Sequence, residues 1–151
     1  MVRQTLIRAL LVLTTFMLCV AKTVAQEKPT EHQWDNVIKA ISVVESGEKP
    51  NARNGQYVGI LQIGNAAVKD CNRINIKNDD PRRYTLKDRY DREKSIEMFW
   101  IIQKFYNPEL DIEKAIRLWN GGVGNLKHPH KTERYYKKVM SVLKKIEETS
   151  E

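Results

Sequence analysis

The chain of 151 residues is long enough for one ordinary domain and too short for two comfortable ones. Hydrophobic residues make up 41% of it and charged residues 30%, with only seven Gly and five Pro, so the composition excludes a disordered or fibrous protein. The 26 basic and 19 acidic residues give a net charge of +7, and two Cys are too few for a disulfide framework.

The first 25 residues have the pattern of an export signal. Arg3 and Arg8 supply a positive start, residues 9–21 are apolar apart from two Thr, and small residues up to Ala25 offer a cleavage site. A retained membrane anchor is the weaker alternative, because the apolar run is short for a membrane span. We therefore expect an exported domain of residues 26–151, periplasmic or associated with the cell envelope, with no stable membrane span after cleavage.

Cleavage would leave a net charge of +4 and Cys71 as the single cysteine, so core packing alone would hold the domain together. The remaining Lys and Arg are scattered among acidic residues without a nucleic-acid motif, and we predict no nucleic-acid partner. The charge favours attraction to an anionic cell wall or to acidic partners. His128 and His130 share a loop without further spaced ligands, so we predict no metal and no cofactor.

Helical periodicity dominates the first half of the expected domain. Thr30–Gln33 has the spacing of a capping box, and apolar residues follow at helical spacing until Gly47 and Lys49-Pro50 end the helix. Residues 51–58 are rich in Asn and Gly and are predicted to form a loop. A second helix is predicted over about residues 65–72, and the polar, poorly periodic residues 73–90 are predicted to form another loop.

Three further helices are predicted after this loop. One covers residues 91–106 and stops at Asn107-Pro108, and a short one begins after Asp111 and breaks at Gly121-Gly122. The last begins after Thr132, which we expect to cap it. Because no run alternates in the manner of a strand, the predicted fold class is all-α, with about five helices.

Glu45 interrupts the apolar face of the first helix. It follows Ile41 by four residues and Ile38 by seven, so it extends the apolar stripe instead of the solvent face. It also lies in the last turn, where the negative end of the helix dipole disfavours a second negative charge. Both effects raise the pKa of a carboxyl, as a general acid near neutral pH requires. The alternative is a frayed helix end that leaves Glu45 in water.

Four segments resemble, in order, the motifs of the soluble lytic transglycosylase family. Residues 45–52 contain Glu-Ser followed by Pro-Asn-Ala at the family's spacing, and residues 59–63 are similar to its Gly-Leu-Met-Gln-Ile motif. Residues 115–122 are similar to its Ala-x-x-x-Tyr-Asn-Ala-Gly segment, and residues 132–139 to its Thr-Arg-x-Tyr-Val-x-x-Val ending. The ordered set spans most of the expected domain.

The resemblance implies a lysozyme-like helical fold with a substrate cleft between two lobes. It also implies cleavage of the β-1,4 bond between N-acetylmuramic acid and N-acetylglucosamine in peptidoglycan, with formation of a 1,6-anhydro ring. Glu45 would be the single catalytic acid and base, because the 6-hydroxyl of the muramic acid replaces the water or second carboxylate of an ordinary glycosidase. Glu48 and Asp70 are interpreted as solvated charges.

The resemblance also implies five substrate-binding residues: Ser46, Gln62, Asn120, Gly122 and Tyr135. Four of them have a structural alternative: an ordinary serine at a helix end for Ser46, a structural hydrogen bond for Gln62, and a helix cap for Asn120 and Gly122. Ser46 is a candidate to bind substrate or to steady the site, Gln62 to contact sugar or to brace Glu45, and Asn120 to hold an acetamido group or to cap a helix. Gly122 would let sugar approach the backbone, and Tyr135 would orient the catalytic carboxyl or the reacting sugar.

The sequence departs from the family at four positions: Tyr57 and Gly121 replace Ala, Leu61 replaces Met, and Trp119 replaces Tyr. These changes affect the shape of the groove more than the acid chemistry. Tyr57, Trp100 and Trp119 are candidates for stacking on sugar rings, with the hydrophobic core as the commoner place for such residues.

Two other functions fit the same resemblance. A hydrolytic lysozyme of the same fold would use a positioned water, and a non-catalytic peptidoglycan-binding or assembly protein would keep the fold alone. Peptidoglycan strands are the predicted partner in each case. A secretion or conjugation machine that spans the envelope is a further partner, suggested only by analogy with the family.

Overall fold

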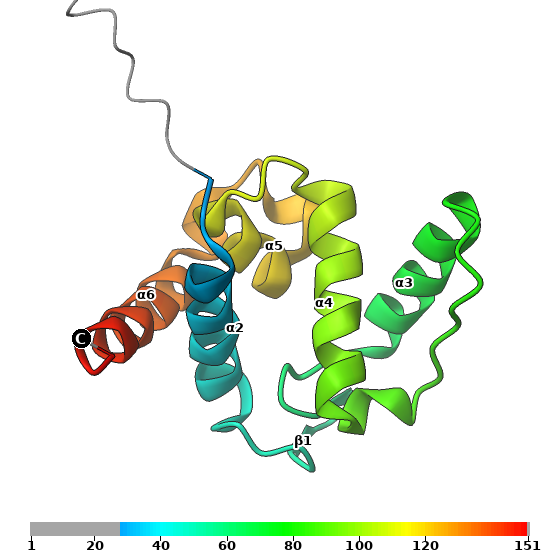
Figure 1. The fold of residues 1–151 in the computed structure, drawn as a ribbon, viewed down its shortest axis with the longest axis horizontal. Coiled ribbons are helices and arrows are strands. Elements are labelled where there is room, and N and C mark those ends of the chain that lie inside the picture. Colours follow the sequence, from blue (N-terminus) through cyan, green and yellow to red (C-terminus); the bar gives the residue numbers. More distant parts are fainter. Residues whose placement is uncertain (1–27, 151) are drawn as a thin grey trace, which may run out of the picture.

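The computed structural model describes residues 28–150, so the predicted export segment 1–25 lies outside the described residues. Helices form most of this part of the chain (Figure 1). They are α2 (Glu31–Ser46), α3 (Asn65–Lys77), α4 (Arg92–Tyr106), α5 (Ile112–Asn125) and α6 (Glu133–Glu148), with short 3-10 helices η1 (Asp88–Tyr90) and η2 (Pro129–Lys131). The all-α prediction is confirmed. Within residues 28–150 no helix has the length and apolar character that crossing a membrane requires.

The predicted start and end of the first helix are confirmed in detail. The Thr30 hydroxyl accepts a hydrogen bond from the Gln33 backbone N–H, and the Gln33 side chain accepts one from the Thr30 N–H at 2.8 Å, which together form the capping box. At the other end Gly47 adopts the left-handed conformation, with φ of 62°. Glu45 therefore lies in the last turn of α2.

Asp91 and Asp111 cap α4 and α5, each accepting a hydrogen bond from a backbone N–H three residues on. The sequence indicated this role for Asp111, whereas it placed Asp91 inside the helix. The prediction that the Thr132 side chain caps α6 is wrong. Thr132 precedes α6, but its hydroxyl donates to the Pro129 carbonyl and accepts from the guanidinium of Arg117. Arg117 is buried and also pairs with Glu133 at 2.8 Å, so it joins the start of α6 to α5.

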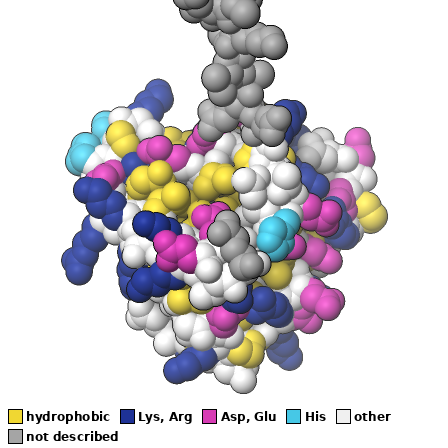
Figure 2. All heavy atoms as spheres, turned by 60° about the vertical axis from the view of Figure 1, so that its left-hand side comes forward, with side chains coloured by type: hydrophobic (Ala, Val, Ile, Leu, Met, Phe, Trp, Pro, Cys, Tyr) yellow, Lys and Arg dark blue, Asp and Glu magenta, His cyan; other side chains and the backbone are white. Residues whose placement is uncertain are grey.

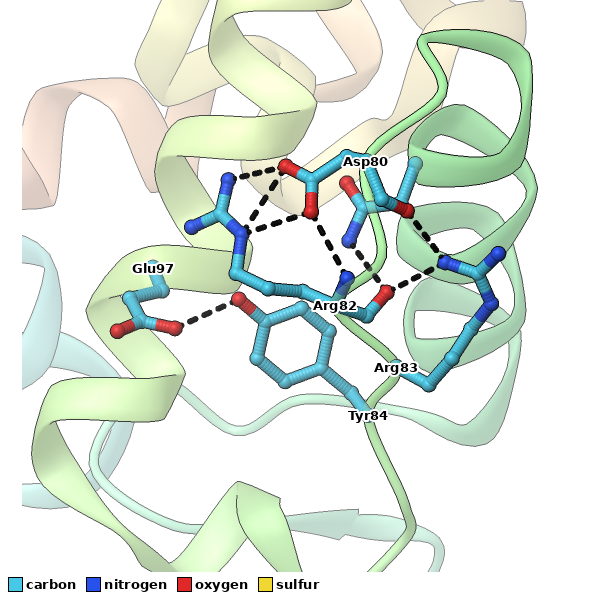
Figure 3. A network of polar contacts seen from close by, with 6 residues as sticks. Asp80, Arg82, Arg83, Tyr84 and Glu97 are labelled. Carbon is cyan, nitrogen blue, oxygen red and sulfur yellow. Dashed lines mark hydrogen bonds and ion pairs between the residues drawn. The ribbon is translucent and has the colours of Figure 1, made fainter.

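The loop prediction for residues 73–90 is partly wrong, because α3 continues to Lys77 and buries Ile74 and Asn75. Between α3 and η1 the segment is held by side chains instead of by a regular backbone pattern. Figure 3 shows Asp80 paired with Arg82 at 2.6 Å and the Tyr84 hydroxyl donating to Glu97 of α4, also at 2.6 Å. Polar residues thus fasten this segment to the helices without producing any helical periodicity in the sequence.

Helix α4 lies between the two halves of the structure. Figure 1 shows α3 on one side of it and α2 and α6 on the other. The core contains fully buried residues from α2, α4, α5 and α6: Val37, Ile41, Met98, Phe99, Ile116 and Val139. Figure 2 shows the face on the side of α2 and α6, where Lys and Arg side chains stand among Asp and Glu side chains.

Residues 51–58, predicted as a loop, contain a small antiparallel hairpin, in which β1 (Arg53–Asn54) pairs with β2 (Tyr57–Val58). Arg89, only 7% exposed, holds this hairpin in place. Its guanidinium donates to the carbonyls of Gln56 and Ile63 and to the side chain of Asn65, at 2.8, 3.1 and 2.9 Å. The backbone of η1 therefore lies directly beneath the hairpin.

Gly59 follows the hairpin and allows this close approach. Its φ is +80°, and a Cβ atom on it would lie 1.8 Å from the carbonyl oxygen of Arg89. Gly55 at the hairpin turn also has a positive φ, of 61°, but a Cβ atom there would meet nothing within 4 Å. A comparison of substitutions at the two glycines therefore separates the cost of a positive φ from the cost of a steric clash.

We predict that Gly59→Ala destabilises the protein far more than Gly55→Ala. The Gly55 variant should lose about 1–2 kcal/mol of unfolding free energy from the left-handed backbone alone, and the Gly59 variant should lose this and the packing of η1 against the hairpin. Urea unfolding of both variants measures the difference. Equal losses would contradict the role given to the Gly59–Arg89 contact.

Candidate active site

A cleft of about 900 Å³ brings together residues from both halves of the structure. Its lining includes Glu45 at the end of α2, the hairpin and the segment after it, α3, the end of α4, and residues 118–123 of α5. Of the six sequence-predicted site residues, four line this cleft: Glu45, Gln62, Asn120 and Gly122. Ser46 and Tyr135 are not part of the lining, but each forms a hydrogen bond that bears on it: Ser46 with the Ile60 carbonyl and Tyr135 with Glu45.

Glu45 is half-buried at the edge of the core, as its place on the apolar stripe of α2 indicated. Burial raises the pKa of its carboxyl above the ordinary value. A hydrogen bond from Tyr135 and the positive charge of Lys138 oppose this shift without reversing it. The group therefore holds its proton to higher pH than an exposed glutamate, while retaining one donor that stabilises the carboxylate once the proton has left.

Tyr135 reaches Glu45 from a distance of 90 residues in the sequence, because α6 packs against α2. Its hydroxyl donates a hydrogen bond of 2.7 Å to Glu45 Oε1. Burial and the charge of Glu45 raise the pKa of Tyr135 well above its usual range, so the phenol remains a donor at all relevant pH values. This hydrogen bond fixes the orientation of the carboxyl toward the cleft.

Ser46 and Gln62 form hydrogen bonds that stabilise the segment after the hairpin. The Ser46 hydroxyl lies 2.8 Å from the Ile60 carbonyl and 3.1 Å from the Ser42 carbonyl, which ties the end of α2 to the segment after the hairpin. These two contacts fit the interpretation that Ser46 steadies the site. The Gln62 amide nitrogen donates to the Gly59 carbonyl at 2.9 Å, so Gln62 both braces the hairpin and lines the cleft.

Asn120 and Gly122 lie at the break in α5. Asn120 is exposed on the cleft lining, and Gly122 leaves helical geometry with φ of 66° and ψ of 176°, which confirms the break predicted at the glycine pair. A Cβ atom on Gly122 would meet nothing within 4 Å. One on Gly121 would lie 2.6 Å from the Thr132 methyl group, which explains why this chain has Gly at that position.

The three aromatic candidates occupy different places. Tyr57 is 46% exposed on the cleft lining, and its ring lies against Gly64, where a Cβ atom would come within 2.9 Å of it. Trp119 is half-buried, lines the cleft and donates its indole N–H to the Leu61 carbonyl. Trp100 packs edge-on against Trp34 at 5.0 Å and is absent from the lining of this cleft. Tyr57 and Trp119 remain the candidates for sugar stacking.

A polar cluster on the α3 side of the cleft was missed by the sequence reasoning. Asp70, interpreted as a solvated charge, is half-buried and accepts hydrogen bonds from Arg73 and from the Tyr106 hydroxyl of α4. The spacing of Asp70 and Arg73 is typical of an ion pair on one helix face and was the one available signal. Nothing in the sequence indicates that Tyr106 joins them, since it is 36 residues away.

In residues 28–150, no group of three or more His, Cys, Asp or Glu side chains is arranged to hold a metal ion. Cys71 is buried without a disulfide among the described residues, and burial raises the pKa of its thiol to about 12. The thiol is therefore held in its unreactive, protonated form.

The geometry defines a helical domain with a half-buried carboxyl in the lining of a cleft. The chain belongs to the transglycosylase SLT domain family, whose model matches residues 22–140. Comparisons with curated proteins and with solved structures gave no match. Family membership confirms the resemblance noted in the sequence and makes peptidoglycan the substrate class.

We predict that Tyr135→Phe lowers the rate of peptidoglycan cleavage by at least about tenfold, from the loss of one hydrogen bond to a charged group. It also removes the donor that stabilises the Glu45 carboxylate, so the pKa of Glu45 rises further. For a general acid at position 45, the alkaline fall in rate should then move to higher pH.

A pH–rate profile of both proteins measures this shift. Tyr136→Phe is the matched control, since Tyr136 is the next residue and its ring packs under Arg117 instead of meeting Glu45. An alkaline limb that stays in place or moves to lower pH in Tyr135→Phe would contradict the assigned interaction.

Proposed function

We propose that the protein is a lytic transglycosylase that cleaves the β-1,4 bond between N-acetylmuramic acid and N-acetylglucosamine. The observation that carries this proposal is the Glu45 carboxyl, whose pKa is raised by burial and which lines a cleft of about 900 Å³. A half-buried acid held by a tyrosine has the properties that a general acid requires.

In the proposed reaction Glu45 first donates its proton to the glycosidic oxygen, and the bond from that oxygen to C1 of the muramic acid breaks. The 6-hydroxyl oxygen of the same sugar then bonds to C1, and its proton passes to the Glu45 carboxylate. The proton given in the first step is thereby recovered, no water is consumed, and the product ends in a 1,6-anhydro ring. Tyr135 stabilises the carboxylate between the two steps.

The cleft lining supports a mechanism with one acid. It contains two carboxyl groups, and that of Asp70 is engaged by Arg73 at 2.7 Å and by the Tyr106 hydroxyl at 2.9 Å. An ordinary glycosidase needs a second carboxylate that is available as nucleophile or base. Because Asp70 is committed to its partners, we favour the transglycosylase over a hydrolytic lysozyme. A non-catalytic binding protein has no need of a buried acid at this position.

We propose that residues 1–25 direct export and are removed, and that residues 26–151 act on peptidoglycan in the periplasm or cell envelope. Service to a secretion or conjugation machine that spans the envelope remains an analogy with the family.

We predict that Glu45→Gln lowers the rate of peptidoglycan cleavage by at least about 10²-fold, the contribution typical of a general acid and base. Glu48→Gln is the matched control, because Glu48 lies three residues further on, pairs with Arg92 at 3.8 Å and is absent from the cleft lining. It should cleave at close to the rate of the unmodified protein.

Mass spectrometry of the released sugars measures the reaction type in the same experiment. The proposed reaction yields 1,6-anhydromuropeptides from the unmodified protein and from Glu48→Gln. Reducing sugar ends in their place would identify a hydrolase. Undiminished cleavage by Glu45→Gln would remove Glu45 from the mechanism.

A further inference from the structure

The cleft contains a positively charged wall that the proposed reaction does not use. Of its lining residues, the two with a positive side chain are Lys69 and Arg73, and both belong to α3. They are four residues apart, so they project from the same face of that helix. Figure 1 shows α3, which carries this wall, and α2, which carries Glu45, on opposite sides of α4.

The Arg73 guanidinium is held in a fixed position. Its Nε and Nη2 atoms donate to Asp70 Oδ1 at 2.9 and 2.7 Å, and Nη2 also donates to the Tyr106 hydroxyl at 2.7 Å. The Tyr106 hydroxyl in turn donates to Asp70 Oδ2 at 2.9 Å. Within the described residues no hydrogen bond uses Nη1, so a donor remains on a group whose orientation is already set.

Lys69 supplies the net charge of this wall. Its side chain is exposed, and among residues 28–150 it forms no ion pair. Asp70 offsets the charge of Arg73, which leaves the cluster of Lys69, Asp70 and Arg73 with one positive charge. A cationic wall with two separate donors fits an anion with more than one oxygen, and a carboxylate has that form.

The sugars of peptidoglycan are uncharged where the lactyl group of muramic acid is bonded to its peptide. The negative charges of such a strand lie on the carboxylates of the stem peptide. We propose that Lys69 and Arg73 bind a stem-peptide carboxylate, so that the cleft recognises the peptide as well as the glycan. This inference rests on the proposed function, since it presumes that the strand occupies the cleft.

Binding of the Glu45→Gln protein to insoluble peptidoglycan tests the inference without any turnover. Sedimentation compares unmodified strands with strands whose carboxylates have been converted to amides. Amidation should weaken binding about fivefold, the effect of one exposed charge pair. Adding Lys69→Gln should weaken binding to unmodified strands to a similar extent and binding to amidated strands less. Lys69→Arg should restore it.

Lys77→Gln is the matched control, because Lys77 is exposed on the same helix and absent from the cleft lining. It should bind both kinds of strand as the parent does. Equal binding of unmodified and amidated strands by the parent, or an equal Lys69→Gln loss on both, would overturn the inference.

A third substrate distinguishes the source of the carboxylate. Strands stripped of peptide by an amidase carry a free lactyl carboxylate on the muramic acid itself. If Lys69→Gln weakens binding to these strands as much as to intact ones, the anion belongs to the sugar and the assignment to the stem peptide is wrong. Because binding is measured separately from cleavage, an inactive protein that still discriminates by charge would fail the proposed reaction and not this inference.

Discussion

The contact between α2 and α6 determines what the cleft can do, because it joins the Glu45 carboxyl to the Tyr135 hydroxyl. Burial at this junction raises the pKa of Glu45, and the 2.7 Å hydrogen bond from Tyr135 stabilises the carboxylate that forms when the proton leaves. Either effect alone would give a poorer acid–base group. A fully desolvated carboxyl would release its proton reluctantly, and an exposed one would lose it before any substrate bound.

Contacts elsewhere in the structure hold α6 and the hairpin, which borders the cleft, in place. Buried Arg117 joins the start of α6 to α5, and buried Arg89 joins the hairpin to η1. Each uses a single guanidinium to satisfy several backbone and side-chain acceptors at once. The glycine at position 59 permits the second of these approaches, since any side chain there would meet the backbone.

The sequence predicted the parts of this arrangement that depend on local physics. The capping box at Thr30 and the place of Glu45 on the apolar stripe follow from spacing along one helix, and the structure confirms both. The role of Tyr135 came only from the resemblance to a family. Contacts between distant segments, such as those of Arg89 with the hairpin and of Arg73 with α4, left no periodic signal, because each depends on one side chain.

The proposed mechanism depends on burial raising the pKa of the Glu45 carboxyl, so that this group has a proton to donate. Titration of the Glu45 side-chain carbon by NMR, with Glu45→Gln used to assign the resonance, measures this pKa directly. We expect a value above the ordinary range of glutamate, about 4.3. A value at or below that range would show that the carboxyl is ionised when substrate arrives, which would contradict its role as the general acid.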